Sequence, residues 1–217
     1  MLGLEDIAAV RRLVSIDIET TGFPIATPAE IQRMPKGMRL PGIIIEIGCI
    51  ELVREADGWR KGESYEQRLN PDGPLHKASI QIHGIQPATL RKMPRFPQIV
   101  EAFQNFLGEA PLLAHSAFNE ISFLNYEFHR AGLASWDEWP FTEERFVCTQ
   151  KLSHAFFPGA SGSLDALCDR LWVDRSNRFQ YHGALLDADL TADVFVKLDG
   201  GFVQDQVRQL TFGSDPS

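Results

Sequence analysis

Two acidic residues, Asp17 and Glu19, lie at the end of a segment in which apolar and polar residues alternate. The alternation covers positions 12–18, and Glu19 follows directly. This alternation, with its β-branched residues, predicts a strand. Side chains two positions apart on a strand point to the same side, so the two carboxylates are expected to project together. Neighbouring carboxylates repel each other unless a cation lies between them, and a hard divalent cation with oxygen ligands meets that need. The alternative is an edge strand with two solvated acids, and this spacing alone does not decide between them.

A second acidic segment begins at His182 and Gly183. The glycine separates the histidine from a predicted helix, so His182 is expected on a loop and Asp187 in the first turns of the helix. A loop histidine suits a general base that must approach and leave an attacking water. Asp187 can complete a cage of three carboxylates with the strand pair. The alternative is a structurally satisfied histidine followed by surface acids at Asp187, Asp189 and Asp193.

The other periodicities predict an α/β fold in which helices pack on a central sheet. Ser163 is the expected N-cap of one helix, and Gly132 is expected to end another. Residues 20–42 contain four prolines and predict a long loop, which in compact domains is often functional. Strands are expected at 12–18, 43–53, 62–69 and 111–114, and helices at 97–107, 117–131, 164–171 and from 183 to about 198.

Length and composition indicate one globular domain, residues 1–200, followed by a polar tail at 201–217. Three widely spaced cysteines without a Cys-x-x-Cys pair indicate neither a disulfide framework nor a zinc site, which favours a reduced intracellular compartment. The most apolar stretch, 42–53, is interrupted by Glu46 and Glu51 and is too short to span a bilayer. We therefore expect a soluble cytoplasmic protein without a membrane partner.

The formal net charge of -8 argues at first against a nucleic-acid partner, because affinity for phosphates usually comes from Lys and Arg. An enzyme that binds only the last few nucleotides needs few phosphate contacts. Acids that hold divalent metals also raise the formal negative count, since the bound ions reverse the local field. Charge alone does not exclude a nucleic-acid substrate.

Taken together, these segments resemble the DnaQ-like, DEDDh family of 3′→5′ exonucleases, and within it most closely the proofreading epsilon subunits of bacterial DNA polymerase III. The similar motifs follow the family's order and spacing from about residue 12 to 199, nearly the whole chain. They are Asp17-Ile-Glu-Thr-Thr-Gly22, Ile44-Ile-Glu-Ile-Gly48, His83-Gly-Ile85, Phe157-Pro-Gly159, Ser163-Leu-Asp-Ala-Leu-Cys168 and His182-Gly-Ala-Leu-Leu-Asp-Ala188.

One motif departs from the family's pattern of His-Asn-Ala-x-Phe-Asp. The chain has His115-Ser-Ala-Phe-Asn-Glu120, which places Glu120 where the family has its aspartate and Asn119 where it has phenylalanine. The extra methylene moves the carboxylate by about 1.5 Å, a displacement of the size that matters in catalysis. In the family this acid often acts on the second metal through water, which can absorb the difference. The competing interpretation is a weak or silent enzyme.

The resemblance implies an RNase H-like fold with a mixed central sheet flanked by helices, and a site for two Mg²⁺ or Mn²⁺ ions. It implies that His182 is the general base and that the product is a nucleoside 5′-monophosphate from the 3′ end of a single strand, with DNA preferred over RNA. The implied metal ligands are Asp17, Glu19, Glu120 and Asp187, and the implied substrate-binding residues are Thr20, Thr21, Gly22, Ile82 and His83. A capping or core role is an equally open alternative for His83.

Three alternatives remain open from the sequence. An RNA-directed family member similar to RNase T or oligoribonuclease has the same motifs, because the preferred sugar is not legible in them. A non-catalytic binding subunit would explain Glu120. Residues 206–212 faintly resemble a sliding-clamp peptide with Leu210 and Phe212 as anchors, although an ordinary mobile tail is the simpler interpretation. DNA polymerase III and its clamp are therefore possible partners.

Overall fold

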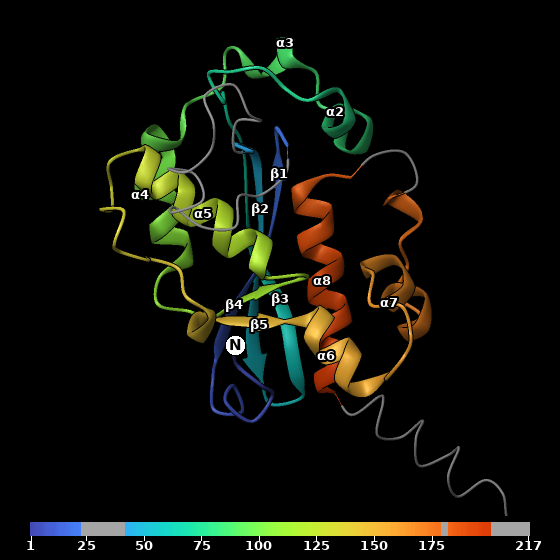
Figure 1. Ribbon diagram of the computed structural model, residues 1–217. Helices are drawn as coiled ribbons and strands as arrows, with labels where there is room; N and C mark the ends of the chain where they lie inside the picture. The colour runs from blue at the N-terminus through green and yellow to red at the C-terminus, as the bar shows by residue number, and fades with distance from the viewer. Residues whose placement is uncertain (23–41, 179–181, 201–217) are drawn as a thin grey trace, which may run out of the picture.

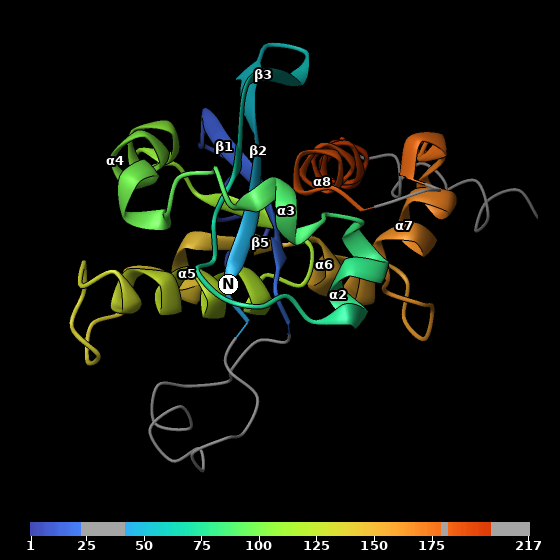
Figure 2. The same ribbon diagram turned by 90° about the horizontal axis from the view of Figure 1, so that it is seen from above.

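The computed structural model describes residues 1–22, 42–178 and 182–200, which form a five-stranded sheet with helices on both faces (Figures 1 and 2). The strand order is β3-β2-β1-β4-β5. The strands are β1 (Arg12–Thr20), β2 (Ile44–Glu55), β3 (Gly58–Arg68), β4 (Leu112–Ala114) and β5 (Phe146–Cys148). The helices are α2 (Lys77–His83), α3 (Pro87–Leu90), α4 (Phe96–Leu107), α5 (Phe118–Arg130), α6 (Thr149–Phe156), α7 (Leu164–Leu171) and α8 (Ala184–Asp199), with 3-10 turns η1 (Glu143–Arg145) and η2 (Ser176–Arg178).

The sheet is mixed, as predicted. Strands β1, β2 and β3 are antiparallel neighbours, whereas β4 and β5 run parallel to β1. The helix bounds agree with the predicted ones to within about one residue, and Ser163 caps α7 by accepting a hydrogen bond from the amide of Ala166. Strand β3 begins four residues earlier than predicted, at Gly58. The predicted loop at 23–41 and the tail at 201–217 lie outside the described residues.

Apart from the two 3-10 turns, four of the described elements were not predicted: α2, α3, α6 and β5. The helices have only four to eight residues, and β5 has three, so none is long enough to establish a period in the sequence. They form because the sheet and the longer helices supply their packing partners. Among the described helices, none has both the length and the apolar character needed to cross a membrane.

The two faces of β1 have different partners. Val14, Ile16 and Ile18 are buried in one core cluster with α4 and α5, whereas Leu13 is buried in another with α8. The Ser15 hydroxyl donates to the carbonyl of Ala188 in α8 at 2.7 Å. Since side chains alternate along a strand, Asp17 and Glu19 belong to the α8 side of the sheet.

Helix α8 lies directly against this side of the sheet at Gly48, which pairs with Asp17 across β1 and β2. A Cβ atom at position 48 would overlap the backbone of Ala184 and Leu185 in the first turn of α8. Glycine is therefore required here for close approach of the helix to the strand. This contact brings the N-terminal turn of α8 to the strand that carries Asp17 and Glu19.

We predict that Gly48→Ala lowers the free energy of unfolding by about 1–3 kcal/mol or more, because α8 must move away from β2. Chemical denaturation of the purified variant measures this loss. Gly73→Ala is the matched control, since a Cβ there meets only a carbonyl oxygen at 3.9 Å. Equal stability of both variants and the parent would contradict the close-approach role of Gly48.

Candidate active site

A cavity of about 350 Å³ lies at the C-terminal end of β1. Its walls come from β1, α2, the N-terminal part of α5 and the segment that enters α8. The predicted catalytic and metal-binding residues all line it: Asp17, Glu19, Glu120, His182 and Asp187. Residues separated by as many as 170 positions in sequence thus share one cavity.

Strand β1 contributes Asp17 and Glu19. Both line the cavity, in agreement with the expectation that they share a face of the strand. Across the β1–β2 pair, Asp17 lies opposite Gly48 and Glu19 lies opposite Glu46. Because Gly48 has no side chain, α8 can approach Asp17 closely, and Asp187 reaches the same cavity.

Helix α8 contributes Asp187 from its first turn, and His182 lies just before the helix, as predicted. One ligand atom from each of Glu19, His182 and Asp187 lies within 4.8 Å of the others. The Nδ1 atom of His182 is 3.3 Å from a carboxylate oxygen of Asp187. The backbone amide of His182 also donates to the carbonyl of Ile82 in α2 at 3.3 Å, so two cavity walls are joined directly.

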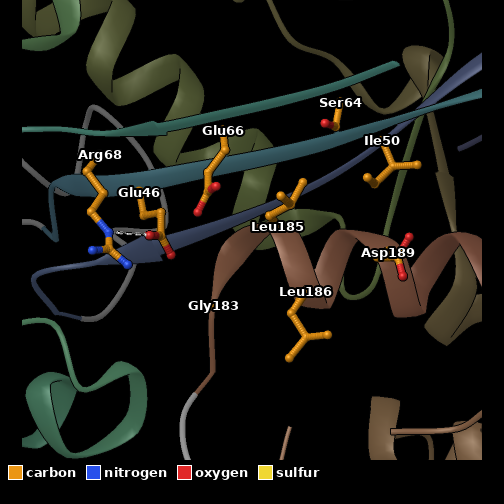
Figure 3. A pocket seen from close by; sticks show the side chains of 9 residues that line it. All are labelled: Glu46, Ile50, Ser64, Glu66, Arg68, Gly183, Leu185, Leu186 and Asp189. Carbon is orange, nitrogen blue, oxygen red and sulfur yellow. Dashed lines mark hydrogen bonds and ion pairs between the residues drawn. The ribbon is translucent and has the colours of Figure 1, made fainter. Parts of the chain in front are cut away.

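Glu46 fixes where α8 begins. Its buried carboxylate accepts a hydrogen bond from the amide of Ala184 at 3.0 Å, and Arg68 of β3 donates to its other oxygen at 2.7 Å (Figure 3). Gly183, at the N-cap, has no side chain to bind the free amides of the first turn. A carboxylate from the neighbouring strand therefore does this, where the positive end of the helix dipole favours it. The sequence pattern gave no signal for this contact.

Helix α5 contributes Glu120 from its first turn. The side chain is only 4% exposed, and its Oε2 atom has no hydrogen-bond partner among the described residues. Burial raises the pKa of Glu120 to about 8. The substituted residue therefore reaches the same cavity as the other acids and keeps one oxygen available for a ligand.

Burial and neighbouring carboxylates raise the pKa values of the two acids of β1. Burial raises the pKa of Glu19 to about 7, with a further contribution from Asp187. The pKa of Asp17 lies well above its usual range because of burial and then the charges of Asp187, Glu120 and Glu19. Such crowding favours protonation unless a cation is present. The donor set of buried carboxylates, with an unpaired oxygen on Glu120, therefore fits a divalent metal ion.

Arg178, the last residue of the described segment 42–178, was not predicted to belong to the site. Its guanidinium donates to both carboxylate oxygens of Asp187, at 2.6 and 2.7 Å, and lies 2.8 Å from Nδ1 of His182. It also donates to Asp165 of α7. Although burial acts in the other direction, hydrogen bonds from Arg178 and His182 lower the pKa of Asp187. The sequence contained Asp165 in a family-like motif but nothing that linked it to Arg178.

The predicted substrate-binding residues do not all reach the cavity. Thr20, Gly22, Ile82 and His83 line it. Thr21 does not, because it is buried and its backbone amide and carbonyl bind Ile43 and His76. The substrate-binding role of Thr21 stays a prediction, and both of its backbone groups are already hydrogen-bonded within the protein. One of these bonds extends the pairing of β1 with β2, and the other joins the end of β1 to the segment before α2.

Ile82 and His83 lie side by side in the sequence but differ in exposure. The side chain of Ile82 is 52% exposed at the cavity, whereas His83 is 4% exposed. His83 accepts a hydrogen bond from the amide of Ile85 on Nδ1 at 3.0 Å. His83 therefore binds the main chain that follows α2, which is a structural role. Because it also lines the cavity, a contact between His83 and a ligand stays a prediction.

Comparison with known proteins identifies the chain's relatives. Residues 14–195 match the family described as Exonuclease. DNA polymerase III subunit epsilon of Haemophilus influenzae is 34% identical over 193 residues, covering 88% of this chain and 68% of that protein. The subunit of the same name from Rickettsia typhi is 37% identical over 202 residues, covering 93% of this chain and 77% of the relative.

Solved structures agree on the fold. The nuclease domain of 3′hExo, described as a DEDDh family member bound to rAMP, superposes with a TM-score of 0.67 at 18% identity, over 90% of this chain and 92% of that one. Exonuclease I of E. coli in complex with a dT13 oligonucleotide gives a TM-score of 0.64 at 15% identity, over 91% and 43%. The predicted RNase H-like fold is confirmed by these likenesses.

We predict that, without divalent cations, thermal stability falls as the pH rises from about 5 to 8. Glu19 and Glu120 have pKa values of about 7 and 8 in the folded protein, above the values near 4.3 of unfolded chains. The folded state therefore keeps protons that the unfolded state loses, and stability decreases across that window. Thermal denaturation in a chelator at several pH values measures this.

Added Mg²⁺ should raise the unfolding midpoint more at pH 8 than at pH 6, because the ion binds ionised carboxylates. Glu120→Gln should flatten the pH dependence in chelator. Glu101→Gln, at an exposed position of α4, is the control and should behave as the parent. A pH-independent midpoint in the parent would contradict the shared burial of the acids.

Proposed function

The chain belongs to the exonuclease family, and from this premise we propose that it removes nucleotides from the 3′ end of single-stranded DNA, releasing nucleoside 5′-monophosphates. The observation that supports this most directly is the convergence of Asp17, Glu19, Glu120 and Asp187 with His182 in one cavity. A metal-dependent 3′→5′ exonuclease needs such a set of oxygen ligands beside a base. A role in proofreading or repair follows from the similarity to epsilon subunits.

The acids would hold two divalent ions, Mg²⁺ or Mn²⁺. We assign Asp17, Glu19 and Asp187 to the ion on the side of the attacking water, and Asp17 with Glu120 to the second. Bound ions of this kind activate the attacking water and stabilise the leaving oxygen. The raised pKa values of Glu19 and Glu120 support this assignment, because a site that crowds acids in this way is poised for cations rather than protons.

His182 would accept the proton of the attacking water. In the ring form that acts as a base, Nδ1 carries the hydrogen and faces Asp187 at 3.3 Å, so we assign Nε2 to the water. The hydrogen bond with Asp187 raises the pKa of His182, which favours the protonated ring that forms during the step. Orientation of the base by a carboxylate is a frequent arrangement in enzymes.

The terminal nucleotide would lie between β1 and α2. Thr20 and Gly22 line the cavity where we place the terminal sugar, and the exposed side chain of Ile82 offers an apolar surface for the base. We propose DNA as the preferred substrate because relatives of 34–37% identity are named subunits of a DNA polymerase. Association with DNA polymerase III is proposed on the same ground, whereas the suggested clamp peptide lies outside the described residues.

The alternative of a silent binding subunit depends on Glu120. The position of its carboxylate on the cavity wall, with a free oxygen, argues for retained activity. A drifted site would not need to keep four acids and a histidine together in a buried setting, because unpaired buried charges are costly. We therefore favour the enzyme.

The proposal predicts that the protein shortens a 5′-labelled single-stranded DNA stepwise in Mn²⁺ or Mg²⁺, and that a chelator stops the reaction. His182→Ala should fold normally and lower turnover by about 10²–10⁴-fold, the usual contribution of a general base. His154→Ala, on α6 away from the cavity, is the matched control.

The rate on an RNA strand of the same sequence tests the RNA-directed alternative. That alternative requires RNA to be degraded at least as fast as DNA. Unchanged turnover in His182→Ala would remove the histidine from the mechanism. An inactive parent that still binds the DNA strand would favour the binding subunit.

We further predict that Glu120→Asp keeps or raises exonuclease activity, because it restores the family's residue at this position of α5. Steady-state rates at saturating Mn²⁺ compare the variant with the parent and with Glu120→Gln, which should be much less active. Complete loss of activity in Glu120→Asp would mean that the surrounding cavity has adapted to the longer side chain.

A further inference from the structure

We propose, on the basis of the proposed metal-dependent function, that Arg178 is a positioning residue that occupies Asp187 in the metal-free protein and releases it when a divalent ion binds. The guanidinium would thus take the place of a cation on this ligand. It would also hold the general base in its place until the ion arrives.

The contact between Arg178 and Asp187 is a paired one. Nε donates to one carboxylate oxygen at 2.6 Å, and Nη2 donates to the other at 2.7 Å. Both side chains are largely buried, with 10% and 6% exposure. A two-point contact between guanidinium and carboxylate is among the stronger and more directional ion pairs in proteins. It engages both oxygens of the only acid that α8 contributes to the cavity.

The same guanidinium restrains His182. Its Nη2 atom is 2.8 Å from Nδ1 of the imidazole, which is itself 3.3 Å from Asp187. Arg178 and Asp187 together therefore set the orientation of the ring.

A divalent ion and this guanidinium cannot both use Asp187 in the same way. Glu19, His182 and Asp187 offer ligand atoms within 4.8 Å of one another, so an ion among them would need an oxygen that Arg178 now binds. The guanidinium cannot relieve the conflict by losing its proton, because it stays charged at all relevant pH values. A metal ion and the guanidinium would also repel each other if both contacted the carboxylate of Asp187.

Asp165 provides a place for the displaced guanidinium. Arg178 donates to it through Nη1, a group that does not touch Asp187. The side chain of Asp165 is 48% exposed, so the arginine can keep this contact while it turns away from the cavity. This gives a role to Asp165 in the motif at 163–168, which does not itself line the cavity.

The test is calorimetric titration of Mn²⁺ into the full chain without nucleic acid. Arg178→Lys keeps the positive charge but cannot bind both oxygens of Asp187 at once, and Arg178→Gln removes the charge as well. Arg60→Gln is the control, because Arg60 is also paired with a carboxylate, that of Glu55 at 2.5 Å, and neither residue lines the cavity. Metal affinity is measured here separately from activity.

We expect Mn²⁺ to bind about threefold or more tightly to Arg178→Lys than to the parent, and about tenfold or more tightly to Arg178→Gln. Arg60→Gln should bind as the parent does. If Arg178→Gln does not fold, the lysine variant alone decides. Affinity in Arg178→Lys equal to or weaker than that of the parent overturns the inference, even when Arg178→Gln binds more tightly, because a change of charge alone would then explain the gain.

Failure of the proposed function gives a different result. If neither the parent nor any variant binds Mn²⁺, the metal-dependent function fails and the inference fails with it. If the parent and Arg178→Lys bind equally well, only the role of Arg178 is lost. If the Arg178 variants bind Mn²⁺ and the parent does not, both the metal-dependent function and the role of Arg178 are supported. The metal ligands would then be present in the parent but blocked by Arg178.

Discussion

Repulsion between carboxylates is the constraint on which the site depends. Asp17, Glu19 and Glu120 line one cavity, where burial raises the pKa values of all three and neighbouring carboxylates raise those of Asp17 and Glu19 further. An isolated set of buried acids of this kind destabilises a fold, because each ionised group loses hydration without gaining a partner. The arrangement becomes favourable when a divalent cation supplies the missing charge. The cost in stability of the metal-free protein and its capacity to bind metal thus have one physical origin.

The fold enforces this crowding through the contact between α8 and β2. Gly48 allows the first turn of α8 to touch the strand, and Glu46 binds the amide of Ala184 at the start of the helix. Both residues belong to one strand segment, and each acts on the helix at a point near Asp187. The helix therefore cannot slide along the sheet without losing a buried hydrogen bond or meeting a steric overlap. Positioning of Asp187 and His182 is a property of the sheet as much as of α8.

Local pattern predicted much of this structure and missed what depends on distant contacts. The alternation before Asp17 predicted both the strand and the common direction of its two acids, because a strand has a fixed period of two. The position of Glu120 came only from the resemblance and its spacing, since a helix start carries no sign of which cavity it will face. The bond between Glu46 and α8 joins residues 138 positions apart, and no local period reports such a pair. Arg178 was missed although its partners are only 4, 9 and 13 positions away, because no predicted helix or strand contained it.

Arg178 also explains how the acids of α8 differ from those of β1. Asp17 and Glu19 have raised pKa values, whereas hydrogen bonds from Arg178 and His182 lower that of Asp187 despite its burial. Protons can neutralise the β1 pair in the absence of metal, and the guanidinium neutralises the α8 acid. The negative charges on the two sides of the cavity are thus neutralised in different ways. Of the two, only the guanidinium is a side chain that must change position to admit an ion. Because it is tied to Asp165 as well, the motion needed is a rotation about an anchored side chain rather than a rearrangement of the chain.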